Sequence, residues 1–161
     1  EPSILAKDDH LIAALRGWGP EIGSSGTFIF HSDDGENWTE PELVTEGTAH
    51  PADLTELSDG QILLTYGARN PKRQRIMARL SPDNGKTWFK PIQLTETYIS
   101  NDFGYPSTQE ISDKKLVTTY YSKPRQKPMF LHEDPKRYKK EGVKGHSIVY
   151  SLEELIHKSN H

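Results

Sequence analysis

The sequence predicts an all-β fold made of about three four-stranded units, and three observations support this prediction. The chain of 161 residues repeats three short motifs with a period of roughly 50 residues. Its apolar segments are short, rich in Ile, Leu, Val, Thr and Tyr, and bounded by turns that contain Asp and Gly. No apolar pattern with a helical period continues for ten residues. A repeat of this length with four strands is typical of one blade of a β-propeller, so we expect blades over residues 1–49, 50–104 and 105–161.

Each unit begins with a residue that precedes a proline, followed by a hairpin whose turn includes an aspartate. The hairpins are expected within residues 5–12, 57–64 and 111–118. The residues before the three prolines are Glu1, His50 and Tyr105. In a propeller the innermost strand of each blade runs beside the axis, and it starts at the funnel where ligands bind. The repeat therefore predicts that a carboxylate, an imidazole and a phenol approach one central site.

A second motif, the Asp-box, occurs at residues 31–38 and 81–88 as x-x-Asp-x-Gly-x-x-Trp. Its aspartate can accept backbone N–H groups in a tight turn, its glycine can adopt a positive φ, and its tryptophan can fold back onto the blade. We therefore expect Asp33, Trp38, Asp83 and Trp88 to stabilise outer turns far from the axis, with no catalytic role. In the first copy this alignment puts His31 in the place of the serine.

The third unit departs from the pattern in its second half. Residues 122–145 are rich in Lys and Arg and are interpreted as a long loop, either a solvated insertion or an anion-binding lid. Residues 146–151 are expected to form a last strand. Ser151 and Glu154 then have the spacing of a capping box, which predicts a short C-terminal helix.

Composition excludes several classes of function. A formal net charge of −3 gives no general attraction to nucleic acid. The longest apolar stretch, residues 11–15, is far shorter than the roughly 18 residues of a membrane span, so no membrane partner is expected. The absence of cysteine excludes disulfides and thiolate sites and leaves the compartment open.

The two Asp-boxes, together with Gly67-Ala68-Arg69 and Gly104-Tyr105-Pro106-Ser107, resemble the sialidase (neuraminidase) superfamily with BNR repeats. The resemblance spans residue 1 to about residue 121 and implies a six-bladed propeller, of which this chain is about half. Three open blades would expose sheet edges, so missing N-terminal blades or a second copy of the chain are expected to complete the fold. The first residue, which is not Met, suggests a longer precursor. The family favours an extracellular or periplasmic location.

The resemblance also implies roles for individual residues. Tyr105 would be the nucleophile and Glu1 its base, in the manner that separates sialidases from most glycosidases. Arg16 and Arg69 would bind the substrate carboxylate, because a guanidinium matches a carboxylate bidentately. The remaining pocket residues, expected to bind hydroxyl groups, are His50, Asp53 and Asp102. The family's acid/base aspartate and third arginine would lie in blades outside this chain.

The function expected is therefore that of an exo-glycosidase of sialidase type, acting on a terminal sialic acid or a related acidic sugar of a glycan. The alternatives are a propeller without catalysis that binds carbohydrate or protein, and another glycan-cleaving chemistry on the same scaffold. Neither the exo-glycosidase nor the non-catalytic binding propeller requires a coenzyme. A metal site at His50 and Asp53, or at residues 132–134, would lack a third ligand. Arg75 and Arg79 are expected to face outward from their strand.

Overall fold

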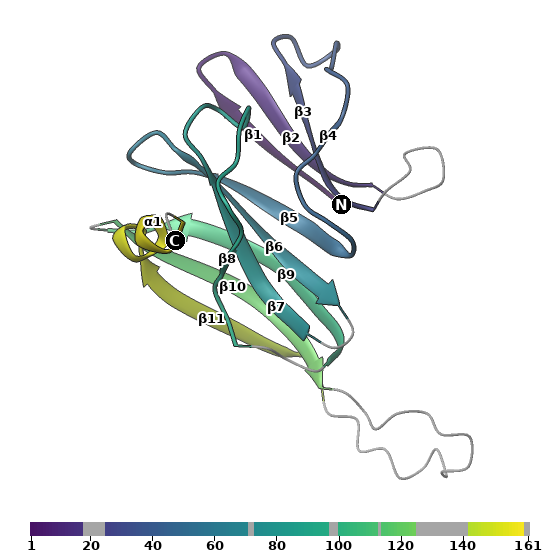
Figure 1. Ribbon diagram of the computed structural model, residues 1–161, viewed down its shortest axis with the longest axis vertical. Helices are drawn as coiled ribbons and strands as arrows, with labels where there is room; N and C mark the ends of the chain where they lie inside the picture. Colours follow the sequence, from purple (N-terminus) through teal and green to yellow (C-terminus); the bar gives the residue numbers. More distant parts are fainter. Residues whose placement is uncertain (18–24, 71–72, 97–99, 113, 125–141, 160–161) are drawn as a thin grey trace.

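The computed structural model describes residues 1–17, 25–70, 73–96, 100–112, 114–124 and 142–159. Within these residues the chain forms three antiparallel sheets and one helix, as expected for an all-β chain. The three sheets lie one after another along the long axis of the molecule, and each packs against the next (Figure 1). Most of the basic insertion, including residues 132–134, lies outside the described residues.

The sheets keep the order of the chain. The first contains β1 (Pro2–Lys7), β2 (His10–Gly17), β3 (Gly26–Ser32) and β4 (Glu42–Leu43). The second contains β5 (Ala49–Glu56), β6 (Ile62–Asn70), β7 (Arg73–Ser81) and β8 (Ile92–Gln93). The third contains β9 (Ser100–Glu110), β10 (Lys115–Pro124) and β11 (Lys144–Ser151), and α1 (Leu152–Ser159) follows it. In the described part of the chain the third sheet therefore has three strands, where four were expected.

The helix packs against the second sheet. Leu152 and Leu155 are buried in a cluster that includes Leu80 of β7 and Ile92 of β8. Its N-terminus is closed as expected by the capping box, in which the Glu154 amide donates to Ser151 Oγ at 3.1 Å and the Ser151 amide donates to Glu154 at 2.9 Å. The helix thus covers apolar surface between the second and third sheets.

Apolar side chains fill the space between neighbouring sheets. Ile12 and Ile29 of the first sheet share a cluster with Ile62 and Leu64 of the second, and all four are 0 % exposed. This fully apolar cluster fixes the first sheet against the second, because each buried side chain of this size contributes roughly 1.5–3 kcal/mol.

A chain of buried hydroxyl groups joins the second and third sheets. Thr108 of β9 is within 2.9 Å of Thr65 and 2.8 Å of Thr118, measured between hydroxyl oxygens. Thr118 continues the chain to the Tyr150 hydroxyl at 2.8 Å, and Thr55 donates to the Thr108 carbonyl at 3.0 Å. Buried polar groups stabilise a fold only when they are satisfied. This network therefore holds β5, β6, β9, β10 and β11 in one register.

The Asp-boxes form turns, but the sequence alignment of the first box was wrong by one position. In the second box Ser81 Oγ donates to Asp83 and accepts the Gly85 amide at 2.8 Å. In the first box the same contacts come from Ser32, which donates to Asp34 and accepts the Gly35 amide at 2.9 Å. The first box is one residue shorter between serine and glycine, so Ser32 takes the serine position instead of His31.

The carboxylate of the first box belongs to Asp34. It accepts the backbone amides of Asn37 and Glu36 at 2.7 and 2.8 Å, and these bonds, with the Asn37 side chain, hold the pKa of Asp34 well below its usual range. Asp33 instead accepts from His10 Nδ1 at 2.6 Å. The other ring nitrogen of His10, Nε2, lies 3.0 Å from His31 Nδ1.

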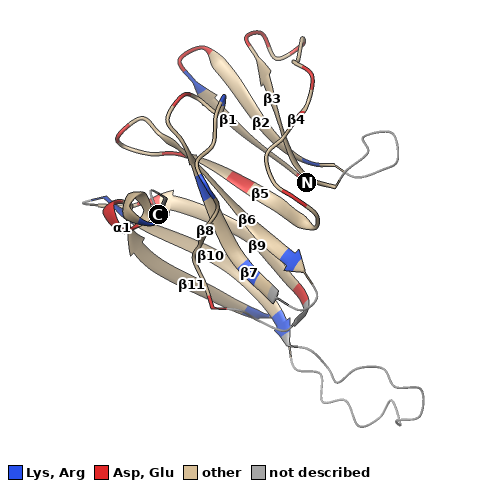
Figure 2. Ribbon diagram, in the orientation of Figure 1, with Lys and Arg blue, Asp and Glu red and all other residues tan. Residues whose placement is uncertain are grey.

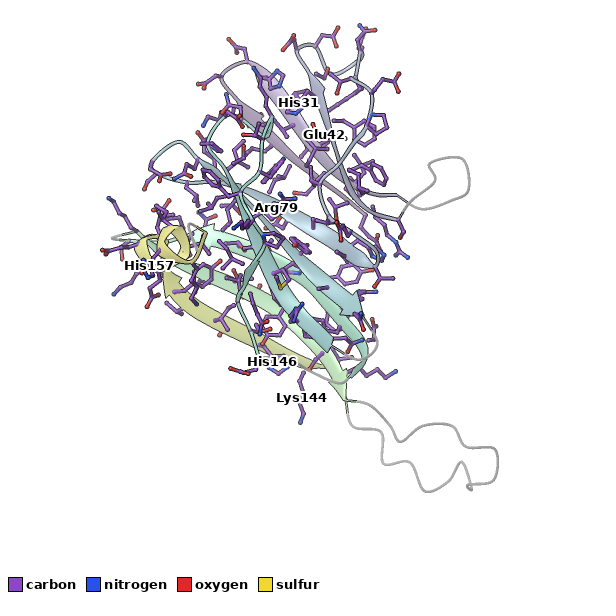
Figure 3. The ribbon with its side chains drawn as sticks, viewed as in Figure 1. His31, Glu42, Arg79, Lys144, His146 and His157 are labelled. Atoms are coloured by element: carbon purple, nitrogen blue, oxygen red, sulfur yellow. The ribbon has the colours of Figure 1, made fainter. Side chains whose placement is uncertain are left out.

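Arg79 also differs from expectation, because its side chain does not face outward. In Figure 3 it lies where the first and second sheets meet. Its guanidinium donates to the carbonyl oxygens of Phe89 and Trp88 and to that of Val44 from the first sheet. Arg79 thus links the backbone at the end of the second Asp-box to Val44 of the first unit, 35 residues away in sequence.

Candidate functional site

The antiparallel topology brings the start of each inner strand and the end of the following strand to the same end of every sheet. In Figure 2 acidic residues occupy the turns between β1 and β2 and between β5 and β6, whereas basic residues mark the far ends of β6 and β10. Glu1, His50 and Tyr105 lie at this basic end, because each stands where an inner strand starts or bends.

Two β-bulges shape this end of the inner strands. In β9 the register passes from Tyr121–Gly104 to Thr119–Ser107, so Tyr105 and Pro106 stand opposite a single residue. In β5 the residues His50 and Pro51 make the same irregularity. A proline has no N–H to donate to the ladder, and a bulge accommodates it while redirecting the preceding side chain. In the second and third sheets the bulge thus falls at the repeated proline, whereas Pro2 of the first sheet pairs with Leu15 in regular register.

The bulge places Tyr105 in an unusual backbone conformation. Its φ is +51°, after Gly104 at +123°. A left-handed tyrosine is uncommon, and such strain concentrates at functional sites. Tyr105 is nevertheless 44 % exposed as a residue.

Tyr105 donates a hydrogen bond to Glu1 across 104 residues of sequence. The hydroxyl oxygen lies 2.6 Å from Glu1 Oε1, and Arg16 Nη1 lies 3.3 Å from the same oxygen. The bond from Tyr105, together with Arg16, lowers the pKa of Glu1, and the same bond raises the pKa of Tyr105. The pair therefore rests as a carboxylate beside a neutral phenol, in which Glu1 is placed to accept the phenolic proton.

Arg69 lies over the Tyr105 ring. Its guanidinium carbon lies 5.2 Å from the ring centroid, within the range of a cation–π contact. Asp102 Oδ1 lies 3.6 Å from Arg69 Nη2. The Tyr121 ring lies 5.6 Å from that of Tyr105. Tyr105 thus contacts both a guanidinium and a second phenol ring.

The other two expected binding residues differ in their environment. His50 is 5 % exposed, and burial together with the charges of Arg16 and Arg69 lowers its pKa, so that its imidazole is neutral at pH 7. Its Nδ1 has no hydrogen-bond partner among the described residues. Asp53 accepts bonds from the Thr108 amide at 2.8 Å and from Ser3 at 3.4 Å, so its carboxylate links the inner strands of all three sheets. These contacts give Asp53 a structural task that the sequence did not indicate.

The structure therefore gathers Glu1, Arg16, His50, Arg69 and Tyr105 into one set of neighbours, with Asp102 at its edge. Sequence reasoning missed Tyr121, although a signal existed. Register pairs Ser3 with Ala14 and Ser107 with Thr119, so Tyr121 stands two residues beyond its pair as Arg16 does in the first sheet. Comparing the repeats at that position would have identified it.

Two further findings concern ligands and membranes. In the described residues no group of three or more His, Cys, Asp or Glu side chains could hold a metal ion. The described part of the chain contains no helix with the length and apolar character that crossing a membrane requires.

The sequence matches the model of the BNR repeat-like domain over residues 1–118. The chain belongs to this family. The match confirms the resemblance to BNR-repeat proteins of sialidase type. A comparison with curated proteins found no match.

Solved structures similar to this BNR repeat-like domain support the same fold. A protein of unknown function from Dyadobacter fermentans is 27 % identical with a TM-score of 0.64, over 76 % of this chain and 33 % of that one. A polysaccharide lyase of family PL25, an ulvan lyase, is 16 % identical with a TM-score of 0.58, over 74 % and 31 %. The GH93 α-L-arabinofuranosidase of Fusarium graminearum is 19 % identical with a TM-score of 0.58, over 76 % and 40 %.

These comparisons confirm a propeller-type architecture for the three sheets. They also show that the chain spans only about a third of the length of the structures it matches. The two enzymes among them act on carbohydrates by their titles, but at this identity the likeness shows the fold alone.

Proposed function

We propose that this BNR repeat-like domain supplies the nucleophile and the anion-binding side of a carbohydrate-cleaving site of sialidase type. The observation that carries the proposal is the 2.6 Å hydrogen bond from Tyr105 to Glu1, flanked by the guanidinium groups of Arg16 and Arg69. The substrate would be a glycan that ends in sialic acid or a related acidic sugar.

In the proposed reaction the Glu1 carboxylate accepts the phenolic proton as the Tyr105 oxygen attacks the anomeric carbon. The bond to the leaving sugar oxygen breaks, and that oxygen takes its proton from an acid outside the described residues. Water then cleaves the glycosyl–tyrosine bond and restores both side chains. A neutral phenol suits an anomeric centre that carries a carboxylate, because it approaches with less repulsion than a carboxylate would.

The cationic groups support an acidic substrate. Arg16 and Arg69 remain charged at any working pH, and each guanidinium can donate two parallel bonds to one carboxylate. Glu1 and Asp102 balance their charge, and His50 adds none because it is neutral at pH 7. The ion pairs within the site are long, 3.3 Å for Arg16–Glu1 and 3.6 Å for Arg69–Asp102. An acidic sugar would therefore compete with weak ion pairs for the two guanidinium groups.

The test is hydrolysis by the longest natural polypeptide that contains these residues, assayed on chromogenic α-sialosides, β-glucuronides and α-L-arabinofuranosides. We expect turnover of a carboxylated sugar. Tyr105→Phe should remove at least 99 % of it, while binding stays within a few-fold, because the ring is kept and the nucleophilic oxygen is lost. Tyr120→Phe is the matched control, since Tyr120 points into the core beside Phe103 and should retain activity.

Full activity in Tyr105→Phe would contradict the nucleophile assignment. Binding of an acidic sugar without turnover in the wild type would instead favour a carbohydrate-binding propeller that lacks catalysis.

A second candidate is eliminative cleavage of a uronic-acid polysaccharide. It is favoured by His50, a buried neutral imidazole whose Nδ1 has no partner among the described residues, beside two arginines that could neutralise a uronate. The fold neighbour titled as an ulvan lyase, one structure of which holds a glucuronate-rhamnose-sulfate unit, adds to the case. Unsaturated products, detected by their ultraviolet absorbance, would distinguish elimination from hydrolysis.

A further inference from the structure

The first sheet has an apolar pocket on its outer face, which is the face turned away from the second sheet. Along β2, Ile12 and Ala14 belong to the cluster shared with the second sheet, so Ala13 and Leu15 point the other way. A pocket of about 360 Å³ opens there, and its lining is almost wholly apolar. The lining residues are Pro2, Ile4, Ala13, Leu15, Phe30 and Trp38. Because the first sheet stands at one end of the row of sheets, this face is left at the end of the molecule (Figure 1).

The repeat allows the outer face to be compared with an interface that the structure contains. Ser32 and Ser81 hold the same place in the two Asp-boxes, since each accepts the amide of the glycine in its box. Ser32 pairs with Leu11 of β2, and Ser81 pairs with Ile62 of β6. The strands β2 and β6 can therefore be aligned residue by residue from Leu11 and Ile62.

This alignment shows that the outer face is built like a face that binds a sheet. Two residues along the strands, Ala13 corresponds to Leu64, and four residues along, Leu15 corresponds to Tyr66. Leu64 and Tyr66 are buried in the cluster between the first and second sheets. The second sheet thus turns this face to the unit that precedes it in the chain. By the same repeat, the outer face of the first sheet is the one that would meet a preceding unit.

The tryptophans of the two Asp-boxes point to the same conclusion. Trp38 and Trp88 each donate from Nε1 to the carbonyl of the glycine in their box, at 3.2 and 3.0 Å. Trp88 packs against the cluster between the first and second sheets. Trp38 lines the pocket and is 38 % exposed, and Ile4 beside it is 61 % exposed. Large apolar side chains gathered on one face at this exposure mark an interaction surface.

Two differences between the faces determine what the pocket can take. Where the second sheet has Leu64 paired with Arg79, the first has Ala13 paired with Phe30. The small Ala13 leaves room that Leu64 would fill. Arg79 also donates to the Val44 carbonyl of the preceding unit, whereas a phenylalanine can donate nothing. The outer face therefore suits a bulky apolar side chain rather than a backbone carbonyl.

We propose that the outer face of the first sheet binds a further blade of BNR type, which precedes residue 1 in the natural polypeptide, and that the pocket receives a bulky apolar side chain of that blade. The solved structures that the chain matches are long enough for such a blade, because the chain spans only 31–40 % of their lengths. The proposal concerns assembly and is independent of the proposed function.

The third sheet of a second copy would fit this pocket poorly. Thr108 and Thr118 point into the hydroxyl network with the second sheet, so their neighbours along the strands point outward. In the middle of the sheet the outward residues are Ser107, Gln109, Val117, Thr119, Ser147 and Val149. Most of these carry a hydroxyl or amide group, and burying such groups against an apolar pocket without hydrogen bonds costs free energy.

A blade bound to the outer face would border the candidate site. Pro2 and Leu15 line the pocket, and they are adjacent in sequence to Glu1 and Arg16. Since the starts of the inner strands come together at the basic end, the inner strand of the bound blade would begin beside Glu1. The outer face is therefore a place from which a neighbouring blade can contribute groups to the site.

The first experiment measures access to the face in the longest natural polypeptide that contains these residues. The reaction rate with a chromogenic thiol reagent is compared for Ile4→Cys and for the control Lys86→Cys, at an exposed Asp-box position, after subtraction of the wild-type rate. We expect Ile4→Cys to react at least about tenfold more slowly, because a bound blade excludes the reagent except when the interface opens. Protection of less than tenfold would overturn the proposal.

The second experiment identifies what lies on the face. Ile4 is replaced by the photo-cross-linking residue benzoylphenylalanine in the same polypeptide, and the cross-linked peptide is identified by mass spectrometry. We expect a peptide that precedes residue 1 within the same molecule, joined through an apolar residue. A cross-link between isotope-labelled and unlabelled molecules would show that a second copy covers the face. That result, or an intramolecular cross-link to a peptide that follows residue 161, would refute the proposal.

Discussion

Gly67 sets the distance between the second and third sheets directly beneath the candidate site. A Cβ added there would lie 3.1 Å from Gly104 Cα, which is backbone and cannot rotate away. Because ordinary carbon contacts are about 3.5–4.0 Å, Gly67→Ala must separate β6 from β9 by about 0.5 Å. The φ angle of Gly67 is not in the left-handed region, so the substitution tests spacing alone.

We expect two effects of Gly67→Ala. Overpacking between sheets should lower the free energy of unfolding by about 1–3 kcal/mol. Moving β9 also moves Tyr105 relative to Glu1, and because a displacement of about 1 Å can cost roughly a hundredfold, kcat/KM should fall about tenfold. Urea titration measures the first effect, and steady-state kinetics on the substrate identified above measures the second.

Gly145→Ala is the matched control, because the added Cβ meets nothing within 4 Å and the residue also lies in a strand with no positive φ. It should be neutral or stabilising by about 0.4–1 kcal/mol through the unfolded chain. If Gly67→Ala equals Gly145→Ala in stability and activity, the close approach of the two strands does not organise the site.

Two more predictions concern stability. Ser81→Ala should lower the free energy of unfolding by about 1–3 kcal/mol, because the Gly85 amide and the Asp83 carboxylate lose the hydroxyl that they share. The control Ser147→Ala, at an exposed position, should change it by no more than about 0.5 kcal/mol in the same urea titration. The pKa of His50 is lowered from 6.5 in the fold, so the unfolded chain takes up a proton first as pH falls. Stability should therefore be complete above about pH 6.5 and decline below it, and His50→Asn should flatten that decline between pH 7 and 5 in unfolding midpoints. A slope unchanged in His50→Asn would mean that its imidazole titrates alike in both states.

Some features of the site could be predicted by comparing equivalent positions of the three repeats. The residues before the repeated prolines, Glu1 and Tyr105, were expected to approach each other, and the structure joins them by a hydrogen bond. Equivalent positions of a repeat occupy equivalent places in the fold, so this inference needed no side-chain detail. Their catalytic roles remain predictions.

Other features depended on how the sheets pack. Asp53 was expected to bind substrate. Its carboxylate accepts hydrogen bonds from Ser3 of β1 and Thr108 of β9, two residues that are remote from it in sequence. Arg79 was expected outside and was found binding the Val44 carbonyl of the neighbouring sheet. Neither contact follows from a pattern along the chain, because the partner atoms belong to neighbouring sheets whose positions are fixed only by packing.

The sequence by itself determined the period, the three hairpin units, the capped helix and the membership of the BNR repeat-like family, since these depend on residue type and spacing within about 50 residues. Tertiary structure alone decided that the first Asp-box is built on Ser32 and Asp34, that Tyr121 lies against Tyr105, and that Asp102 lies beside Arg69. The reason is geometric. A one-residue change in a turn or a bulge reassigns every side chain near it, and only the packed strands fix which assignment satisfies the buried polar groups.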